Sequence, residues 1–216
     1  MHMLTNLSIK EYIQEVDSDK PAPGGGSVAA LVGALGVSLA RMYGHLSISK
    51  KAFLQLEYSI QYNFHKSFEE LQICEKRLIE LVDEDALLYP RILQAYRLPK
   101  DTMEEQNLRN QAIQQATILA IEGPYAIAKC AYDALLHIDI LLPYGNKNVI
   151  SDAACAIVLL EATIETALIN MEINLASLTN KDKYNDYKQN IITLRKYTKE
   201  KKDQLMKLAH PLKVEE

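Results

Sequence analysis

The stretch "VISDAACAIVLLEATIETALINMEINLASL", residues 149–178, decides the fold class. Its length and composition predict a helix, and its apolar residues cover almost every side of that helix rather than a single stripe. A helix that is apolar all round is buried among other elements. The sequence therefore predicts that this segment is the central helix of a bundle.

Signals typical of helices continue on both sides of this segment. Ser8 and Thr102 are each followed three residues later by Glu, the spacing of a capping box at a helix start. Ser27 is expected to be the N-cap of a helix that ends near Leu46, and the helix after Thr102 is expected to reach Leu142. That helix passes a Gly-Pro pair at residues 123–124, where we expect a kink.

A periodic pattern without glycine covers residues 51–96, with a kink expected at Pro90, and a strongly charged segment predicts one more helix at the end. No segment of useful length alternates as a strand would. We therefore expect a single domain, residues 1–216, with an all-α fold: an antiparallel up-and-down bundle of about six or seven helices.

Composition and charge restrict the classes of binding partner and the cellular compartment that we expect for this protein. The 216 residues are 48% hydrophobic, the net charge is -4, and Lys and Arg are scattered, so we expect a soluble protein without a nucleic-acid or membrane surface. The apolar run 28–40 is shorter than the roughly 20 residues that a membrane span needs. Three cysteines, far apart in sequence and without metal-ligand spacing, predict reduced, buried thiols in the cytoplasm and no metal site.

The segment "DKPAPGGGSVAALVGALGVSLARMYGHLSISKK", residues 19–51, brings three consecutive glycines to a helix start. A P-loop would need Lys-Ser/Thr after the glycines, and a dinucleotide-binding loop would need a preceding strand; both are missing. Two interpretations stay open: a plain turn with a cap, or a helix N-terminus at Gly24, Gly25, Gly26 and Ser27 that holds an anion. The small residues that follow at helical spacing predict close packing, inside the bundle or across a dimer.

One carboxylate interrupts the apolar stripe of the segment 51–96. The stripe consists of Leu71, Cys74, Leu78, Val82, then Leu88 or Tyr89, Ile92 and Tyr96, and Asp85 occupies the position that continues it. Asp83 lies about 200° round the helix, on the polar side. A carboxylate that faces a core tends to have a raised pKa suited to proton transfer, although a structural Asp bonded across the bundle would fit the pattern equally well.

Further polar clusters have both a functional and a structural interpretation. Lys100 and Arg109 flank a helix start, where they could hold carboxylates or be ordinary solvated charges. Asn146, Asn148 and Asp152 surround another helix start and could contact a ligand or only cap the helix. Asn170 and Asn174 share one helix face, where they could bind a ligand or satisfy each other.

Taken together, five stretches resemble the formiminotransferase-cyclodeaminase C-terminal family: "PAPGGGSVAALVGALGVSLARM", "LSISKKAF", "LVDEDALLYPRILQAYRLPKDTMEEQNLR", "GNKNVISDAACA" and "NMEINL". The likeness extends from about Ile9 to Leu178, with the stretches in the same order. One departure is Ser49, where the family often has glycine before the basic pair. The family also includes proteins fused to a formiminotransferase domain, which we do not expect here.

The resemblance implies an all-helical homodimer that acts on tetrahydrofolate one-carbon derivatives without a metal or redox cofactor. The "VDED" stretch matches the family's catalytic acidic motif, so the resemblance and the stripe both point to Asp85, with Asp83 as the other carboxylate. The helix start at Gly24–Ser27, together with Lys50, Lys51, Lys100 or Arg109, would then hold the glutamate carboxylates of a folate, including polyglutamylated forms.

Three functions follow from the resemblance. The first is a cyclodeaminase that closes 5-formiminotetrahydrofolate to 5,10-methenyltetrahydrofolate and releases ammonia, with a carboxylate as base and then acid. The second is a methenyltetrahydrofolate cyclohydrolase, which would need the same folate site. The third is a non-catalytic folate-binding or helical interaction module, against which the inward Asp85 argues because a buried carboxylate is costly.

Overall fold

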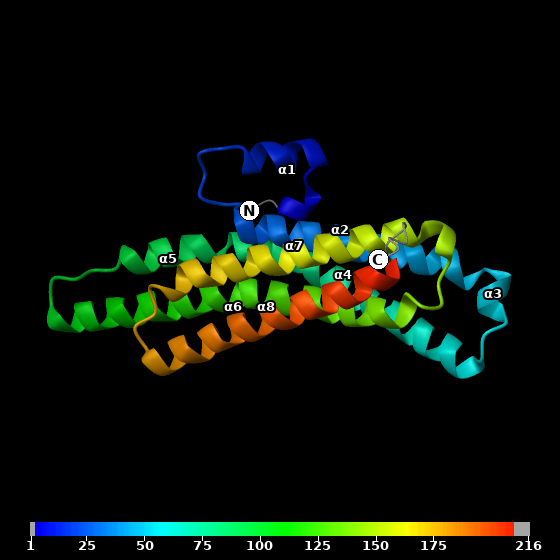
Figure 1. Cartoon of the computed structure of the whole chain (residues 1–216). Helices are drawn as coiled ribbons and strands as arrows, with labels where there is room; N and C mark the ends of the chain where they lie inside the picture. The colour runs from blue at the N-terminus through cyan, green and yellow to red at the C-terminus, as the bar shows by residue number, and fades with distance from the viewer. Residues whose placement is uncertain (1–2, 210–216) are drawn as a thin grey trace.

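The computed structural model describes residues 3–209, and every regular element in this range is a helix (Figure 1). The long helices are α2 (Gly25–Ile48), α4 (Tyr58–Ala86), α6 (Met103–Leu141), α7 (Ile150–Leu175) and α8 (Lys181–Ala209). The short elements are α1 (Ile9–Val16), α3 (Lys51–Leu54), α5 (Leu88–Tyr96) and the 3-10 turns η1 (Leu4–Asn6) and η2 (Lys147–Val149). The predicted all-α class is confirmed.

The long helices form an antiparallel bundle. Helices α2, α4, α6 and α7 pack in a ring, each against the next, and α8 covers the outer side of α7 and α6. Figure 1 shows that consecutive long helices run in opposite directions, with α1 outside this bundle. The prediction that the segment 149–178 is a central helix is confirmed only in part: α7 contacts α2, α6 and α8, but its remaining face is exposed.

Two of the three predicted helix N-caps are confirmed, and the third is wrong. Capping boxes form at Ser8 and Thr102, where each side chain accepts from the N–H of the Glu three residues later. The expected N-cap role of Ser27 is wrong, because α2 begins two residues earlier, with Gly24 as its N-cap. Ser27 lies buried in the first turn, and its hydroxyl donates to the Val82 carbonyl of α4 at 2.7 Å.

The predicted continuous helix over 51–96 is three helices. The break between α4 and α5 lies within the apolar stripe, at Leu87. It comes three residues before Pro90, where the kink was expected. A proline ring clashes with the carbonyl four residues earlier and offers no N–H to it, and that carbonyl belongs to Ala86, the last residue of α4. The break shifts the helical phase, so Tyr96, which the stripe placed inward, is 50% exposed, and Tyr89, one of two alternatives at its stripe position, is 44% exposed.

The small residues of α2 pack inside the chain. Gly33 faces α4 and α7, where an added Cβ would lie 2.9 Å from Thr163 Cγ2 and 3.3 Å from the Leu78 methyl carbons. Gly44 faces the Phe68 ring of α4 in the same way. Of the two predicted roles, close approach within the bundle is therefore the one that this face performs.

Two segments, Gly25–Ile48 and Lys147–Leu175, are long and apolar enough to cross a membrane by composition alone. Half of each segment is buried against neighbouring helices, as in the core helices of a bundle. Their outward faces carry exposed apolar side chains, namely Leu35, Met42 and Leu46 on α2 and Val158, Ile169 and Ile173 on α7.

The cysteines differ from the expectation of dispersed, buried thiols. Cys155 is exposed on α7, so its predicted burial is wrong; the outward face of a helix that is apolar on all sides cannot be identified from composition. Cys74 and Cys130 lie together between α4 and α6, with the Cys130 Sγ donating to the Cys74 carbonyl at 3.5 Å. Helix packing brings them together despite their separation in sequence.

Candidate active site

Two of the three consecutive glycines make room for polar side chains from other helices. An added Cβ at Gly25 would lie 3.0 Å from Asn170 Nδ2 of α7, and one at Gly26 would overlap the Asp85 carboxylate of α4. Gly24 has open space, with only the Pro21 carbonyl at 3.7 Å. The glycines therefore let an amide and a carboxylate approach the start of α2, which a larger residue would prevent.

Asp85 is half-buried at this junction, as the stripe predicted. Burial raises the pKa of Asp85, while hydrogen bonds from the backbone N–H and the hydroxyl of Ser27 oppose the shift. The hydroxyl contact is long, 3.5 Å to Oδ2, because that hydroxyl points mainly to the Val82 carbonyl. The carboxyl group is thus desolvated and only weakly hydrogen-bonded, a state in which proton binding and release are both accessible.

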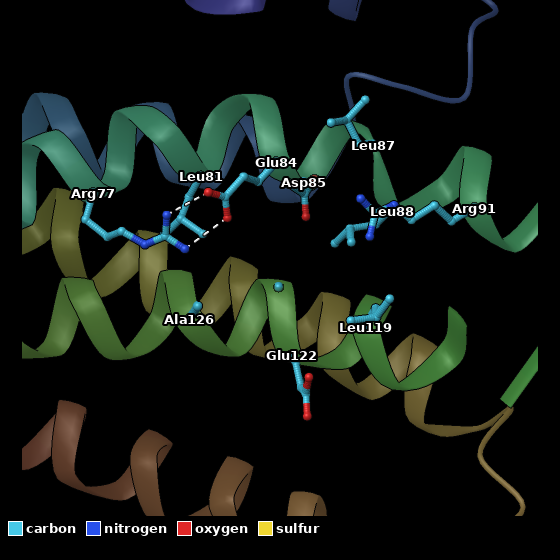
Figure 2. Close-up of a pocket in the computed structure, with 11 residues that line it drawn as sticks. Arg77, Leu81, Glu84, Asp85, Leu87, Leu88, Arg91, Leu119, Glu122 and Ala126 are labelled. Atoms are coloured by element: carbon cyan, nitrogen blue, oxygen red, sulfur yellow. Dashed lines mark hydrogen bonds and ion pairs between the residues drawn. The ribbon is translucent and has the colours of Figure 1, made fainter. Parts of the chain in front are cut away.

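The Asp85 carboxylate lies where two cavities meet. The glycine cavity, about 270 Å3, is bordered by the start of α2 with Asp85, Ile92, Asn170 and Asn174. The arginine cavity, about 310 Å3, lies between α4–α5 and α6 and is bordered by Asp85, Leu88, Arg91 and Gly123. Figure 2 shows Asp85 pointing from α4 toward α6, with Arg91 reaching back along α5 toward Leu88. A ligand in either cavity can therefore contact the same carboxylate.

Asp83 has a different environment from the solvated one that was predicted. Its carboxylate accepts hydrogen bonds from the Leu4 N–H and from the Thr5 hydroxyl, the latter at 2.7 Å. These bonds attach η1 to α4, and Asp83 borders neither of the two cavities, so Asp83 holds η1 in place. The face assignment separated Asp83 from Asp85 correctly, but it could not predict that the N-terminal segment covers Asp83.

Several predicted binding residues lie at the far end of the bundle from Asp85. Lys50 and Lys51 follow the last turn of α2, and a helix of this length spans roughly 36 Å. Asn146 joins them there, because its N–H donates to Ser47 Oγ at 2.8 Å. Asn148 and Asp152, in η2 and the first turn of α7, belong to the same end. Within one chain, none of these residues borders the two cavities that meet at Asp85.

Lys100 and Arg109 form a third group, near the loop between α5 and α6. Lys100 is exposed in that loop. The Arg109 guanidinium lies 5.4 Å from the Tyr96 ring centroid, and its Nε donates to the Tyr96 carbonyl at 3.2 Å. Neither residue borders the two cavities that meet at Asp85.

Two residues near Asp85 were not identified from the sequence. Tyr12 is the buried residue of α1, and within residues 3–209 its hydroxyl has no hydrogen-bond partner. Burial, with the nearby charges of Asp85 and Asp83, raises the pKa of Tyr12 to about 12. Arg91 borders the arginine cavity with Asp85. A phase calculation that restarted at the Leu87 break could have found Arg91, whereas α1 gives no sequence signal for where it packs.

Known proteins with similar sequences carry related names. A family model described as formiminotransferase-cyclodeaminase matches residues 8–193. A methenyltetrahydrofolate cyclohydrolase from Methylorubrum extorquens is 32% identical over 179 residues, which cover 83% of this chain and 84% of the relative. A formimidoyltransferase-cyclodeaminase from Rattus norvegicus is 32% identical over 177 residues, 82% of this chain and 32% of that longer protein.

A solved structure supports the fold. The crystal structure of a formiminotetrahydrofolate cyclodeaminase from Thermotoga maritima superposes with a TM-score of 0.76 at 23% identity, over 94% of each chain. The family match covers both the glycine stretch and the helix that carries Asp85. The chain belongs to the formiminotransferase-cyclodeaminase family.

Proposed function

We propose that this protein is a cyclodeaminase, which closes 5-formiminotetrahydrofolate to 5,10-methenyltetrahydrofolate and releases ammonia. The observation that carries the proposal is the Asp85 carboxylate, desolvated at the junction of two cavities. The relatives of this protein bear the names of a methenyltetrahydrofolate cyclohydrolase and of formimidoyltransferase-cyclodeaminases; both names refer to one-carbon groups, and the first also names tetrahydrofolate.

The reaction needs one proton to move between two nitrogens of the same substrate. N10 attacks the carbon of the protonated formimino group on N5, a new N10–C bond forms, and Asp85 takes the N10 proton. Asp85 then returns this proton to the amino group of the tetrahedral intermediate, the C–N bond breaks, and ammonia leaves. The positive charge is then shared by N5 and N10 of the methenyl product, so atoms and charge balance.

Two physical effects would accelerate this ring closure. Both reacting groups belong to one molecule, so the cavities accelerate closure by holding the folded conformer. General base and then general acid catalysis by Asp85 contributes roughly 100-fold to 10,000-fold. The raised pKa of Asp85 favours this double role, because a group must be both deprotonated and protonated in the same cycle.

A second candidate function is methenyltetrahydrofolate cyclohydrolase. It is favoured by the relative from Methylorubrum extorquens, which this chain matches over 84% of the relative's length. In that reaction a water adds to the methenyl carbon, and the same carboxylate would take the water proton and return it to the departing ring nitrogen. The two functions therefore share the site and differ in the incoming and leaving groups.

One experiment separates these functions. The purified protein is incubated with 5-formiminotetrahydrofolate and, separately, with 5,10-methenyltetrahydrofolate, and both ammonia and the absorbance of the methenyl group are followed. We expect catalysed ammonia release with appearance of the methenyl absorbance. Loss of methenyl absorbance with the second substrate alone would identify a cyclohydrolase, and no catalysis of either reaction would contradict an enzymatic function.

We also propose that the protein is a homodimer. The exposed apolar side chains on the adjoining helices α2 and α7 form a face that a second copy would cover, and Ile173 of this face borders the glycine cavity as well. Light scattering should then give twice the chain mass of 24.4 kDa. Leu35→Glu should shift the protein toward the monomer, whereas a monomeric wild-type protein at micromolar concentration would contradict the proposal.

A further inference from the structure

The two asparagines of the glycine cavity have fixed amide orientations. Asn174 Nδ2 donates to the Ala120 carbonyl of α6 at 2.8 Å and to the Asn170 carbonyl at 3.0 Å, which uses both of its hydrogens. Asn170 Nδ2 donates to the Thr166 carbonyl at 2.8 Å. Because a carbonyl can only accept, the nitrogen of each amide must be the atom on that side.

The oxygens of both amides therefore remain as acceptors. In the described part of the chain no donor reaches either Oδ1, and both side chains border the glycine cavity with the Asp85 carboxylate. Gly25 lets the Asn170 amide lie against the backbone at the start of α2. The side chains of this cavity thus present three acceptor groups, while Ile92, Ala120 and Pro124 supply apolar walls. The donors at its border are the second Nδ2 hydrogen of Asn170 and the N–H groups of the first turn of α2, which begins without a side-chain cap.

Side-chain acceptors select a ligand by its donors. A carboxylate or phosphate would be attracted by the start of α2 but would lie beside the Asp85 carboxylate and two amide oxygens, whereas a flat heterocycle with adjacent N–H groups would satisfy these three oxygen-bearing groups. In a tetrahydrofolate the donors are the 2-amino group and the neighbouring N3–H of the pterin ring, and the glutamate tail carries the acceptors.

We infer that Asn170 and Asn174 bind the donor edge of the pterin head, so that the glycine cavity takes the head of the folate and not its anionic tail. This inference rests on the proposed function for its ligand. It leaves the arginine cavity, with Arg91 at its border, for the remainder of the molecule. Asn170 and Asn174 are then specificity residues that orient the one-carbon group toward Asp85.

The test compares tetrahydrofolate with its 2-desamino-2-methyl analogue, which lacks the amino donors. Affinities are measured by calorimetry for the wild type and for Asn170→Ala. The wild type should prefer tetrahydrofolate by about tenfold, the value of one lost hydrogen bond in a partly enclosed site. In Asn170→Ala this preference should fall toward one, while binding of the 2-methyl analogue stays within about twofold of wild type.

Two further variants complete the design. Asn174→Ala should also lose the preference, but it breaks the bond to Ala120, so Asn170, whose amide bonds within its own helix, is the cleaner probe. Asn185→Ala, at an exposed position of α8, is the matched control and should keep the tenfold preference. A wild type that binds neither folate would contradict the proposed function. A wild type that binds without preference, or folded variants that retain it, would overturn only the present inference.

Discussion

Asp85 couples catalysis to stability. Its pKa is raised in the folded state by burial, so between the ordinary carboxyl value of 3.8 and the raised value the folded protein binds more protons than the unfolded chain. The contribution of Asp85 to stability therefore falls as the pH rises through that window. We predict that Asp85→Asn has a higher Tm than wild type at pH 7, and that the gain shrinks as the pH is lowered toward 3.8, measured by calorimetry across pH.

Asp83→Asn is the matched control for this prediction. Its carboxylate accepts from Leu4 and Thr5, so the substitution weakens the attachment of η1 and should lower Tm at pH 7. If Asp85→Asn were less stable than wild type at pH 7, Asp85 would be a structural acceptor with an ionised form that the fold requires.

The position of Asp85 could be predicted from sequence because helical phase is a local property. Leu71, Cys74, Leu78 and Val82 fix the buried side of α4, and Asp85 continues it within one turn. The neighbours of Asp85 could not be predicted, since Gly26 of α2 lies against it and Asn170 of α7 borders the same cavity, and both belong to helices far apart from α4 in the chain. The prediction of buried positions from helical phase was wrong beyond Leu87, because the break caused by Pro90 begins a new helix with a different phase.

Helix α2 depends on glycine where α4 and α7 come closest. At Gly33 an added Cβ would already be 2.9 Å from Thr163, so Gly33→Val must push α7 or α4 outward. We predict a loss of about 1–3 kcal/mol in the free energy of unfolding, measured by urea denaturation. Leu108→Val introduces a β-branched residue at an exposed position of α6, away from the proposed dimer face, and should change stability by no more than about 0.5 kcal/mol. Equal effects of the two substitutions would exclude close packing as the reason for glycine.

A substitution of glycine in the first turn of α2 should affect turnover rather than stability, unlike a substitution in the middle of the helix. A Cβ at Gly26 would overlap the Asp85 carboxylate, which can rotate away without moving a helix. Gly26→Ala should therefore lower turnover on the order of 100-fold through misplacement of the carboxylate, while Tm changes little. Turnover and Tm are measured on the same preparation. Unchanged turnover would mean that the carboxylate position seen here is not needed for the reaction.

The bundle as a whole separates the predicted binding residues into distant groups. The resemblance assigned Lys50 and Lys51 to the substrate, but roughly 36 Å of helix α2 lies between them and Gly25. The sequence could not reveal this separation, because it does not show whether polar residues from different helices meet in one site or lie at opposite ends of the bundle. We propose that these lysines bind the folate at the site of a second copy.

Mixing two impaired variants tests whether Lys51 of one copy serves the site that contains Asp85 of the other. We predict that Lys51→Ala weakens turnover and that co-refolding it with Asp85→Asn restores about a quarter of the wild-type activity. Half of the random dimers would be mixed, and each mixed dimer would contain one intact site of two. Activity no greater than the sum of the separate variants would show that Lys51 does not serve the site of a partner.

The central claim is that Asp85 carries the proton during ring closure, and the most direct measurement is the single-turnover rate with 5-formiminotetrahydrofolate. Asp85→Asn keeps the shape of the side chain but cannot transfer the proton, so its rate should fall on the order of 100-fold or more with folate affinity retained. Asp83→Asn, on the side of η1, should cost much less, with circular dichroism confirming that both variants fold. A slow Asp83→Asn enzyme beside a nearly active Asp85→Asn enzyme would contradict the account.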